Sequence, residues 1–153
     1  MSHWNNNITA LAAFYLSKGD YIQCIKYGTI SMKGYPKIWN DESGGNVAIV
    51  LAKAKLLAGQ LDSAEYMLDI VIKNNSNDTA TFGQGYELLP IALQVKVLLK
   101  IKTGNLDEAE KIVIRCRELI DRYRIPAYAG AGIAAPDYYL ALVRIALPSR
   151  VVR

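Results

Sequence analysis

Apolar residues recur every three or four positions along most of this chain, which is the spacing of one face of an α-helix. The pattern predicts seven helices, over the ranges of about 8–16, 21–32, 46–58, 61–73, 90–103, 106–123 and 137–147. Pro136 suits the first position of the last helix, because a proline there loses no intrahelical hydrogen bond. The periodicity therefore predicts an all-α fold.

Turn-forming residues separate several of these predicted helices. The run from Trp39 to Gly45 is rich in such residues, and we expect it to form a loop. Residues 74–79 form a polar break, and residues 125–132 do not predict a regular helix. Gly28 lies inside a helical pattern, where it costs about 1 kcal/mol relative to alanine. We interpret Gly28 as a point of close packing against a neighbouring helix.

Three of the connections between helices use the same kind of turn. Each begins with a glycine, at positions 19, 59 and 104, followed by Asp, Gln or Asn and then a new helical pattern. Glycine ends a helix well because it adopts the left-handed conformation without a Cβ clash. The turns are 59 − 19 = 40 and 104 − 59 = 45 residues apart. Recurrence of one turn predicts a repeat of helical hairpins.

The composition is that of a folded domain. The chain has 153 residues, of which 52% are apolar and 21% are charged, and its net charge is only +4. This balance gives weak grounds for nucleic-acid binding. No apolar run reaches the ~18 to 20 residues that a membrane span needs, and the polar start does not resemble a signal peptide. We expect a cytoplasmic protein that does not enter a membrane.

Candidate chemistry is sparse in this sequence. Cys24 and Cys116 lie far apart at apolar helical positions, which predicts buried free thiols, and His3 is the only histidine. Acidic residues in the first turns of helices complement the helix dipole, worth about 0.3–1 kcal/mol each, and need no catalytic role. These residues are Asp62, Glu65, Asp107, Glu108 and Glu110. We predict no enzyme, no metal site and no cofactor.

The hairpin sequences resemble the tetratricopeptide repeat family. The family's positions are occupied by Leu11, Ala12, Tyr15, Gly19, Tyr21 and Cys24 in the first hairpin, by Leu51, Ala52, Gly59, Leu61, Ala64 and Leu68 in the second, and by Gly104, Leu106, Ala109 and Val113 in the third. The resemblance implies a single domain over residues 1–153, built as a right-handed α–α superhelix. It would contain about three helix–turn–helix units, at about 6–33, 46–74 and 86–124, and a capping helix at about 136–147.

The resemblance also implies a function. Members of this family bind a protein or peptide partner in a concave groove lined by the first helices of the hairpins. In the family register the groove residues are Thr9, Ala13, Ile49, Lys53, Ile91, Gln94 and Leu98. This largely apolar trough suits an amphipathic helix, an apolar peptide or a second copy of the chain. An open alternative is that some of these side chains meet the C-terminal helix and bind nothing.

Two other functions remain open from the sequence. The chain is similar in size to small three-repeat chaperones that hold an apolar client segment. It also has a basic surface, since Lys111, Arg115 and Arg122 lie near one face of a predicted helix and could meet an acidic partner or a phosphate backbone. Acidic residues on the same helix can neutralise this surface, so a nucleic-acid-associated regulator is the less favoured hypothesis.

Overall fold

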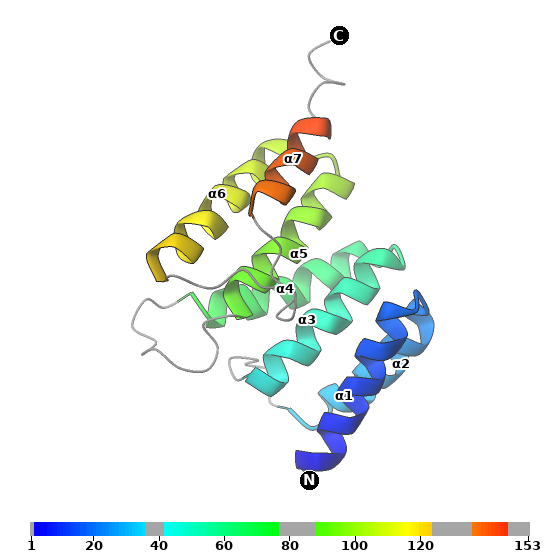
Figure 1. Cartoon of the computed structure of the whole chain (residues 1–153). Helices are drawn as coiled ribbons and strands as arrows, with labels where there is room; N and C mark the ends of the chain where they lie inside the picture. Colours follow the sequence, from blue (N-terminus) through cyan, green and yellow to red (C-terminus); the bar gives the residue numbers. More distant parts are fainter. Residues whose placement is uncertain (1, 36–41, 77–87, 124–135, 147–153) are drawn as a thin grey trace. The chain divides into compact units, whose positions relative to one another are not determined.

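A computed structural model of the chain describes residues 2–35, 42–76, 88–123 and 136–146. The described residues form α-helices and no strand (Figure 1), which confirms the all-α prediction. The helices are α1 (Ser2–Ser17), α2 (Tyr21–Met32), α3 (Glu42–Leu57), α4 (Leu61–Asn74), α5 (Leu88–Lys102), α6 (Leu106–Tyr123) and α7 (Pro136–Ala146). The predicted ranges of the first, third and fifth helices differ from the observed ones by two residues or more at their starts.

The third helix shows the main error of the sequence prediction. Residues 42–45 were expected to belong to a loop, but α3 begins at Glu42 and includes Gly44 and Gly45. Both glycines are buried within the helix. The helical penalty of glycine is only about 1 kcal/mol per residue, and tertiary packing routinely overrides a penalty of that size. The prediction of a loop over residues 42–45 was therefore wrong.

The contacts between Cα atoms divide the chain into two compact units. The N-terminal unit spans Met1–Leu89 and the C-terminal unit spans Pro90–Arg153. In the N-terminal unit α1 packs on α2, α2 packs on α3, and α3 packs on α4, while α1 also touches α3. In the C-terminal unit α7 packs on α6 (Figure 1).

The N-terminal unit packs closely around small side chains. Ala12, Cys24 and Ala54 are fully buried together, one each from α1, α2 and α3. Gly28 of α2 lies against α3, where an added Cβ would sit 3.2 Å from the Cδ1 atom of Leu51. This contact confirms the interpretation of Gly28 as a point of close helix packing. Small residues at the contact allow the two backbones to approach.

One core cluster of the C-terminal unit is made of three valines and an alanine. Val97 from α5, Val113 from α6 and Val143 from α7 are buried together with Ala109. Burial of Val143 with Val97 and Val113 means that α7 packs on the α5–α6 hairpin. Each fully buried valine contributes roughly 1.5–3 kcal/mol relative to an exposed one.

The three hairpin turns have the same backbone geometry. Gly19, Gly59 and Gly104 have φ angles of +76°, +82° and +76°, which confirms the left-handed conformation predicted for them. In each turn the glycine amide donates to the carbonyl three residues earlier at 3.1 Å. The next amide donates to the carbonyl five residues before it, at 3.0, 2.8 and 2.9 Å. This pair of hydrogen bonds is the Schellman motif, which satisfies carbonyls at the helix end.

Two leucines at helical positions are partly exposed. Leu57 of α3 is 41% exposed, whereas its neighbour Leu56 is 2% exposed. Because α3 contacts α1, α2 and α4, the helix buries Leu56, but Leu57 at its last position remains outside these contacts in part. Leu11 of α1, which fills a family position in the sequence, is also partly exposed.

Candidate interaction surfaces

Acidic side chains near the starts of helices act as caps. The Asp20 carboxylate accepts a hydrogen bond from the Gln23 amide at 3.1 Å at the start of α2. In α6, the Glu108 carboxylate accepts from the Asn105 amide group at 2.9 Å and pairs with the Lys100 ammonium at 3.1 Å. Both arrangements stabilise a helix N-terminus. These contacts account for the two carboxylates without any catalytic chemistry.

The described part of the chain also offers little else for chemistry. It contains no group of three or more histidine, cysteine, aspartate or glutamate side chains that could hold a metal ion. Within the same residues, none of the helices combines the length and the apolar character needed to cross a bilayer.

The two cysteines are buried free thiols, as their positions in the sequence predicted. Burial raises the pKa of the Cys116 thiol to about 11, although a hydrogen bond with Gln94 opposes the shift. The Cys116 thiol donates to the Pro90 carbonyl, with 3.8 Å between sulfur and oxygen. Burial also raises the pKa of the Cys24 thiol. Both thiols are therefore protonated and poorly nucleophilic at neutral pH.

Four of the groove candidates lie in the N-terminal unit. Thr9 faces α2, since its hydroxyl oxygen is 2.7 Å from that of the buried Ser31. Ile49 is 5% exposed and offers almost no surface to a partner. Ala13 on α1 and Lys53 on α3 are exposed. Since α1 and α3 are in contact, Ala13 and Lys53 belong to neighbouring first helices.

The other three groove candidates lie on α5 in the C-terminal unit. Ile91 and Leu98 are partly buried, whereas Gln94 is 2% exposed. Gln94 borders the same small space as Cys116 and Tyr139, so it lies close to the last helix. For Gln94 this matches the alternative that a groove candidate meets the C-terminal helix.

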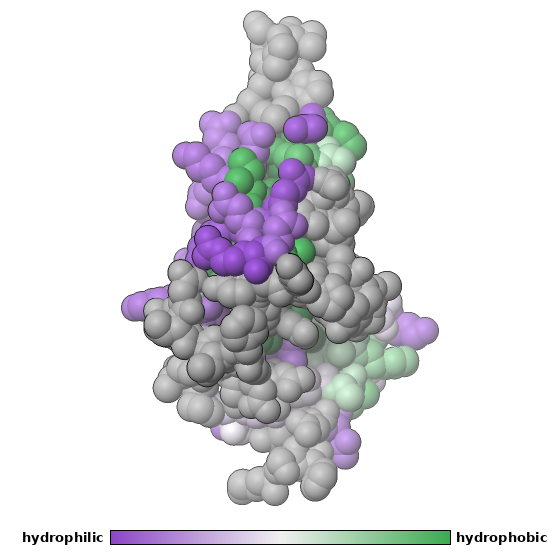
Figure 2. All heavy atoms as spheres, turned by 60° about the vertical axis from the view of Figure 1, so that its left-hand side comes forward, coloured by the Kyte–Doolittle hydropathy of each residue, from purple (hydrophilic) through white to green (hydrophobic). Residues whose placement is uncertain are grey.

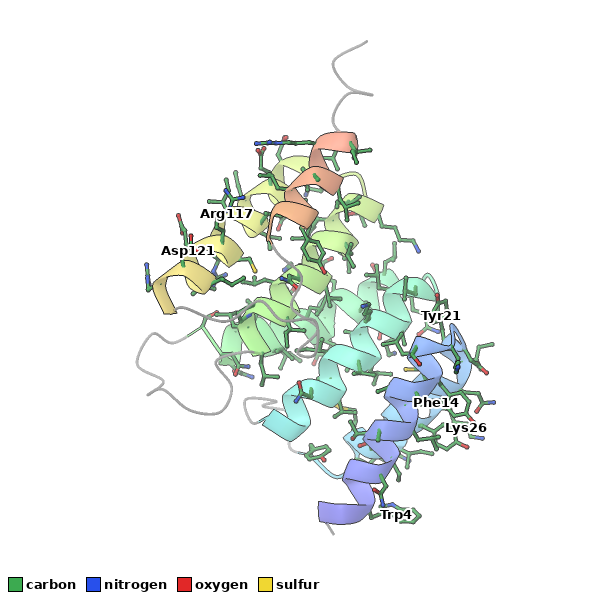
Figure 3. All side chains as sticks on the ribbon, in the orientation of Figure 1. Trp4, Phe14, Tyr21, Lys26, Arg117 and Asp121 are labelled. Carbon is green, nitrogen blue, oxygen red and sulfur yellow. The ribbon has the colours of Figure 1, made fainter. Side chains whose placement is uncertain are left out.

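The proposed basic surface lies on α6. Lys111, Arg115 and Arg122 are all exposed, as the spacing predicted. The helix carries five acidic and four basic residues, so its own net charge is 4 − 5 = −1. Figure 2 shows hydrophilic residues gathered over α6, and in Figure 3 Arg117 and Asp121 leave the same outer side of this helix. Opposite charges are thus mixed on this surface, which weakens its attraction for phosphate.

A further surface was missed by the sequence reasoning. Trp4 and Phe14 on α1 are 71% and 52% exposed, and the partly exposed Leu11 lies on the same side of the helix at i+7 from Trp4. The sequence offered a signal, because Trp4, Leu11 and Phe14 follow one another at spacings of seven and three residues, which one side of a helix brings together. Exposure of this side depends on which helices pack on α1, and the sequence alone does not give those neighbours.

Aromatic contacts join this surface to α2. The rings of Phe14 and Tyr15 meet edge to face at 5.6 Å, and Tyr15 and Tyr27 are stacked at 5.4 Å with an interplanar angle of 4°. The Lys18 ammonium lies 5.6 Å from the centre of the Phe14 ring, and the Lys26 ammonium lies 5.5 Å from that of Tyr27. We call these five residues the aromatic–lysine ladder.

Comparison with known proteins gives no further identification. No family model matches the chain, and no match was found among curated proteins or among solved structures.

Proposed function

We propose that this chain is a protein-interaction module of the tetratricopeptide type, with an adaptor or regulatory function. The equivalent Schellman turns at Gly19, Gly59 and Gly104 support a repeat of one hairpin unit. In this proposal the hairpins follow a right-handed superhelix and α7 is its cap. The partner is a peptide or helical segment of another protein, bound on the first-helix face.

The observation that carries the proposal is the pair of neighbouring first helices α1 and α3. They are in contact, and each leaves a groove candidate exposed, namely Ala13 and Lys53. Beside Lys53, the exposed side chain of Leu57 adds apolar area to α3. A small residue, an apolar residue and one cation give a surface to which a helical segment can pack closely. The two buried free thiols support a reducing, cytoplasmic location.

The experiment is quantitative affinity purification from the cells that make this protein, using the whole chain as bait. The variants Lys53→Glu and Leu98→Glu change the first-helix face in the two units, and Arg115→Glu changes the exposed surface of α6. We expect at least one copurifying protein to be lost with Lys53→Glu or Leu98→Glu and retained with Arg115→Glu. Circular dichroism checks that each variant keeps its helical content.

Two outcomes contradict this proposal. Loss of a partner only with Arg115→Glu, together with a steep dependence on salt, supports the nucleic-acid-associated or acidic-partner alternative on α6. Retention of every copurifying protein by all three variants removes the first-helix face as the binding surface.

A further inference from the structure

The exposed side of α1 that carries Trp4, Leu11 and Phe14 is distinct from the first-helix face of the proposed groove. Leu11 and Ala13 are two residues apart, which places them about 200° apart around the helix axis. In Figure 3 Trp4, Phe14 and Lys26 lie on the same side of the α1–α2 hairpin. The hairpin therefore has an apolar surface that the groove does not use.

Lysines predominate among the charged side chains of the α1–α2 hairpin. Among residues 2–35 the charged side chains are Lys18, Lys26, Lys33 and Asp20. The Asp20 carboxylate is engaged as the cap of α2. The described carboxylates make no ion pair with Lys18 or Lys26, and both lysines lie against aromatic rings. Two lysines thus stand at the ends of an aromatic cluster.

We propose that the aromatic–lysine ladder and the adjoining Trp4 and Leu11 bind an acidic amphipathic segment of a partner protein. Apolar side chains of that segment would cover Leu11 and Phe14. Its carboxylates would pair with the ammonium groups of Lys18 and Lys26. Complementary charge at the rim of an apolar contact fixes register and excludes wrong partners.

The same observations disfavour two other occupants. A second copy of the chain bound symmetrically through this surface would set lysines against lysines, which is repulsive. Single-stranded nucleic acid needs open ring faces for its bases to stack on. Tyr15 and Tyr27 already stack on each other, so one face of each ring is covered.

The test begins with selection from a displayed library of random peptides of about 16 residues, enough for roughly four helical turns. The whole wild-type chain is the target, and selected peptides are then titrated by fluorescence anisotropy. The ladder variants are Lys18→Glu with Lys26→Glu, and Phe14→Ser. The matched controls are Lys73→Glu with Lys102→Glu, and Tyr66→Ser, which make comparable changes at exposed positions outside both surfaces. Lys53→Glu and Leu57→Ser probe the first-helix face. Circular dichroism checks the fold of every variant.

We expect the selected peptides to combine aspartate or glutamate with leucine, phenylalanine or tryptophan. The double lysine variant should weaken their binding by about tenfold or more, and added salt should weaken wild-type binding. Phe14→Ser should weaken binding by at least about fivefold, and the two controls should bind as the wild type does.

Four outcomes overturn the inference. The first is that no selected peptide depends on the ladder, and the second is that selection favours basic or uncharged peptides. A third is competition by oligothymidylate with a selected peptide, which would assign the surface to nucleic acid. The fourth is weakening by Lys53→Glu or Leu57→Ser in place of the ladder variants. That last result places binding on the first-helix face, so it contradicts this inference and supports the proposed function.

Discussion

One core cluster of the N-terminal unit and one of the C-terminal unit bury different kinds of side chain. The cluster shared by α1, α2 and α3 consists of two alanines and a cysteine, whereas the cluster shared by α5, α6 and α7 consists of three valines and an alanine. Beside its cluster of small residues, the α1–α2 hairpin exposes Trp4, Phe14 and Ile22. In the C-terminal unit, α6 keeps most of its charges outside, and Val113 on its apolar side is buried. Large exposed apolar side chains thus lie on the hairpin whose core cluster is built from small residues.

Each unit contains one buried cysteine, so the opening of the two units can be measured and compared. Cys24 belongs to the N-terminal unit and Cys116 to the C-terminal unit. A buried thiol reacts with a maleimide only when its surroundings open. Labelling rates at the two cysteines, measured by mass spectrometry, therefore report the opening of each unit separately.

The largest expected effect is that of Leu68→Ala in the N-terminal unit. Leu68 is fully buried, so the change should lower the free energy of unfolding by about 2–5 kcal/mol. Labelling of Cys24 should accelerate more than labelling of Cys116. Leu57→Ala is the matched control, because Leu57 is exposed, and should cost well under half as much. Equal acceleration at both cysteines would mean that the two units do not open separately.

Much of this architecture was predictable from the sequence. The helical period predicted α2, α4, α6 and α7 to within a residue or two, because a turn that begins with glycine precedes each of α2, α4 and α6, and a proline begins α7. The interpretation of Gly28 was also correct, because a glycine within a helical pattern commonly marks the close approach of a neighbouring helix. The bounds of these four helices thus depend on residues that are close together in the sequence.

What the sequence did not predict depends on tertiary neighbours. The start of α3 was missed because burial, and not propensity, keeps Gly44 and Gly45 helical. The family register named Ile49 and Gln94 as groove residues but could not show how deeply they are buried. The exposure of Phe14 likewise follows from which sides of α1 are covered by α2 and α3.

The next expected effect is a loss of stability at alkaline pH through Cys116. The pKa of this thiol is about 11 in the folded chain, against an ordinary value of 9.0. The group is protonated in both states below about pH 9. As the pH rises from about 9 to 11, the unfolded state ionises first, and the free energy of unfolding falls by about 2–3 kcal/mol.

Urea unfolding of the wild type and of Cys116→Ala between pH 7 and pH 10.5 measures this contribution. The comparison uses the slopes of stability against pH, because the substitution also changes packing. The wild type should lose more stability than the variant above about pH 9. Equal slopes would show that Cys116 is not responsible for the loss.

A smaller effect is expected from alanine at the turn glycines of the two units. An added Cβ at Gly59 or Gly104 would meet no atom within 4 Å, so only the left-handed backbone conformation is penalised. Each of Gly59→Ala and Gly104→Ala should therefore cost about 1–2 kcal/mol. Urea unfolding gives the two values, and a difference much larger than about 1 kcal/mol would mean that the turns are not equivalent.

The smallest expected effect is a gain in stability at the start of α4. The residues that precede α2 and α4 have nearly the same backbone geometry. Asp20 precedes α2 with φ −86° and ψ 78°, and its side chain caps the helix. Gln60 precedes α4 with φ −84° and ψ 65°, but its side chain makes no cap hydrogen bond. Because the backbone already has the right shape, Gln60→Asp should add about 0.5–1 kcal/mol. Thermal unfolding measures the gain, with Gln60→Ala as the control that adds no cap. A variant no more stable than this control would show that the cap of Asp20 depends on more than its backbone conformation.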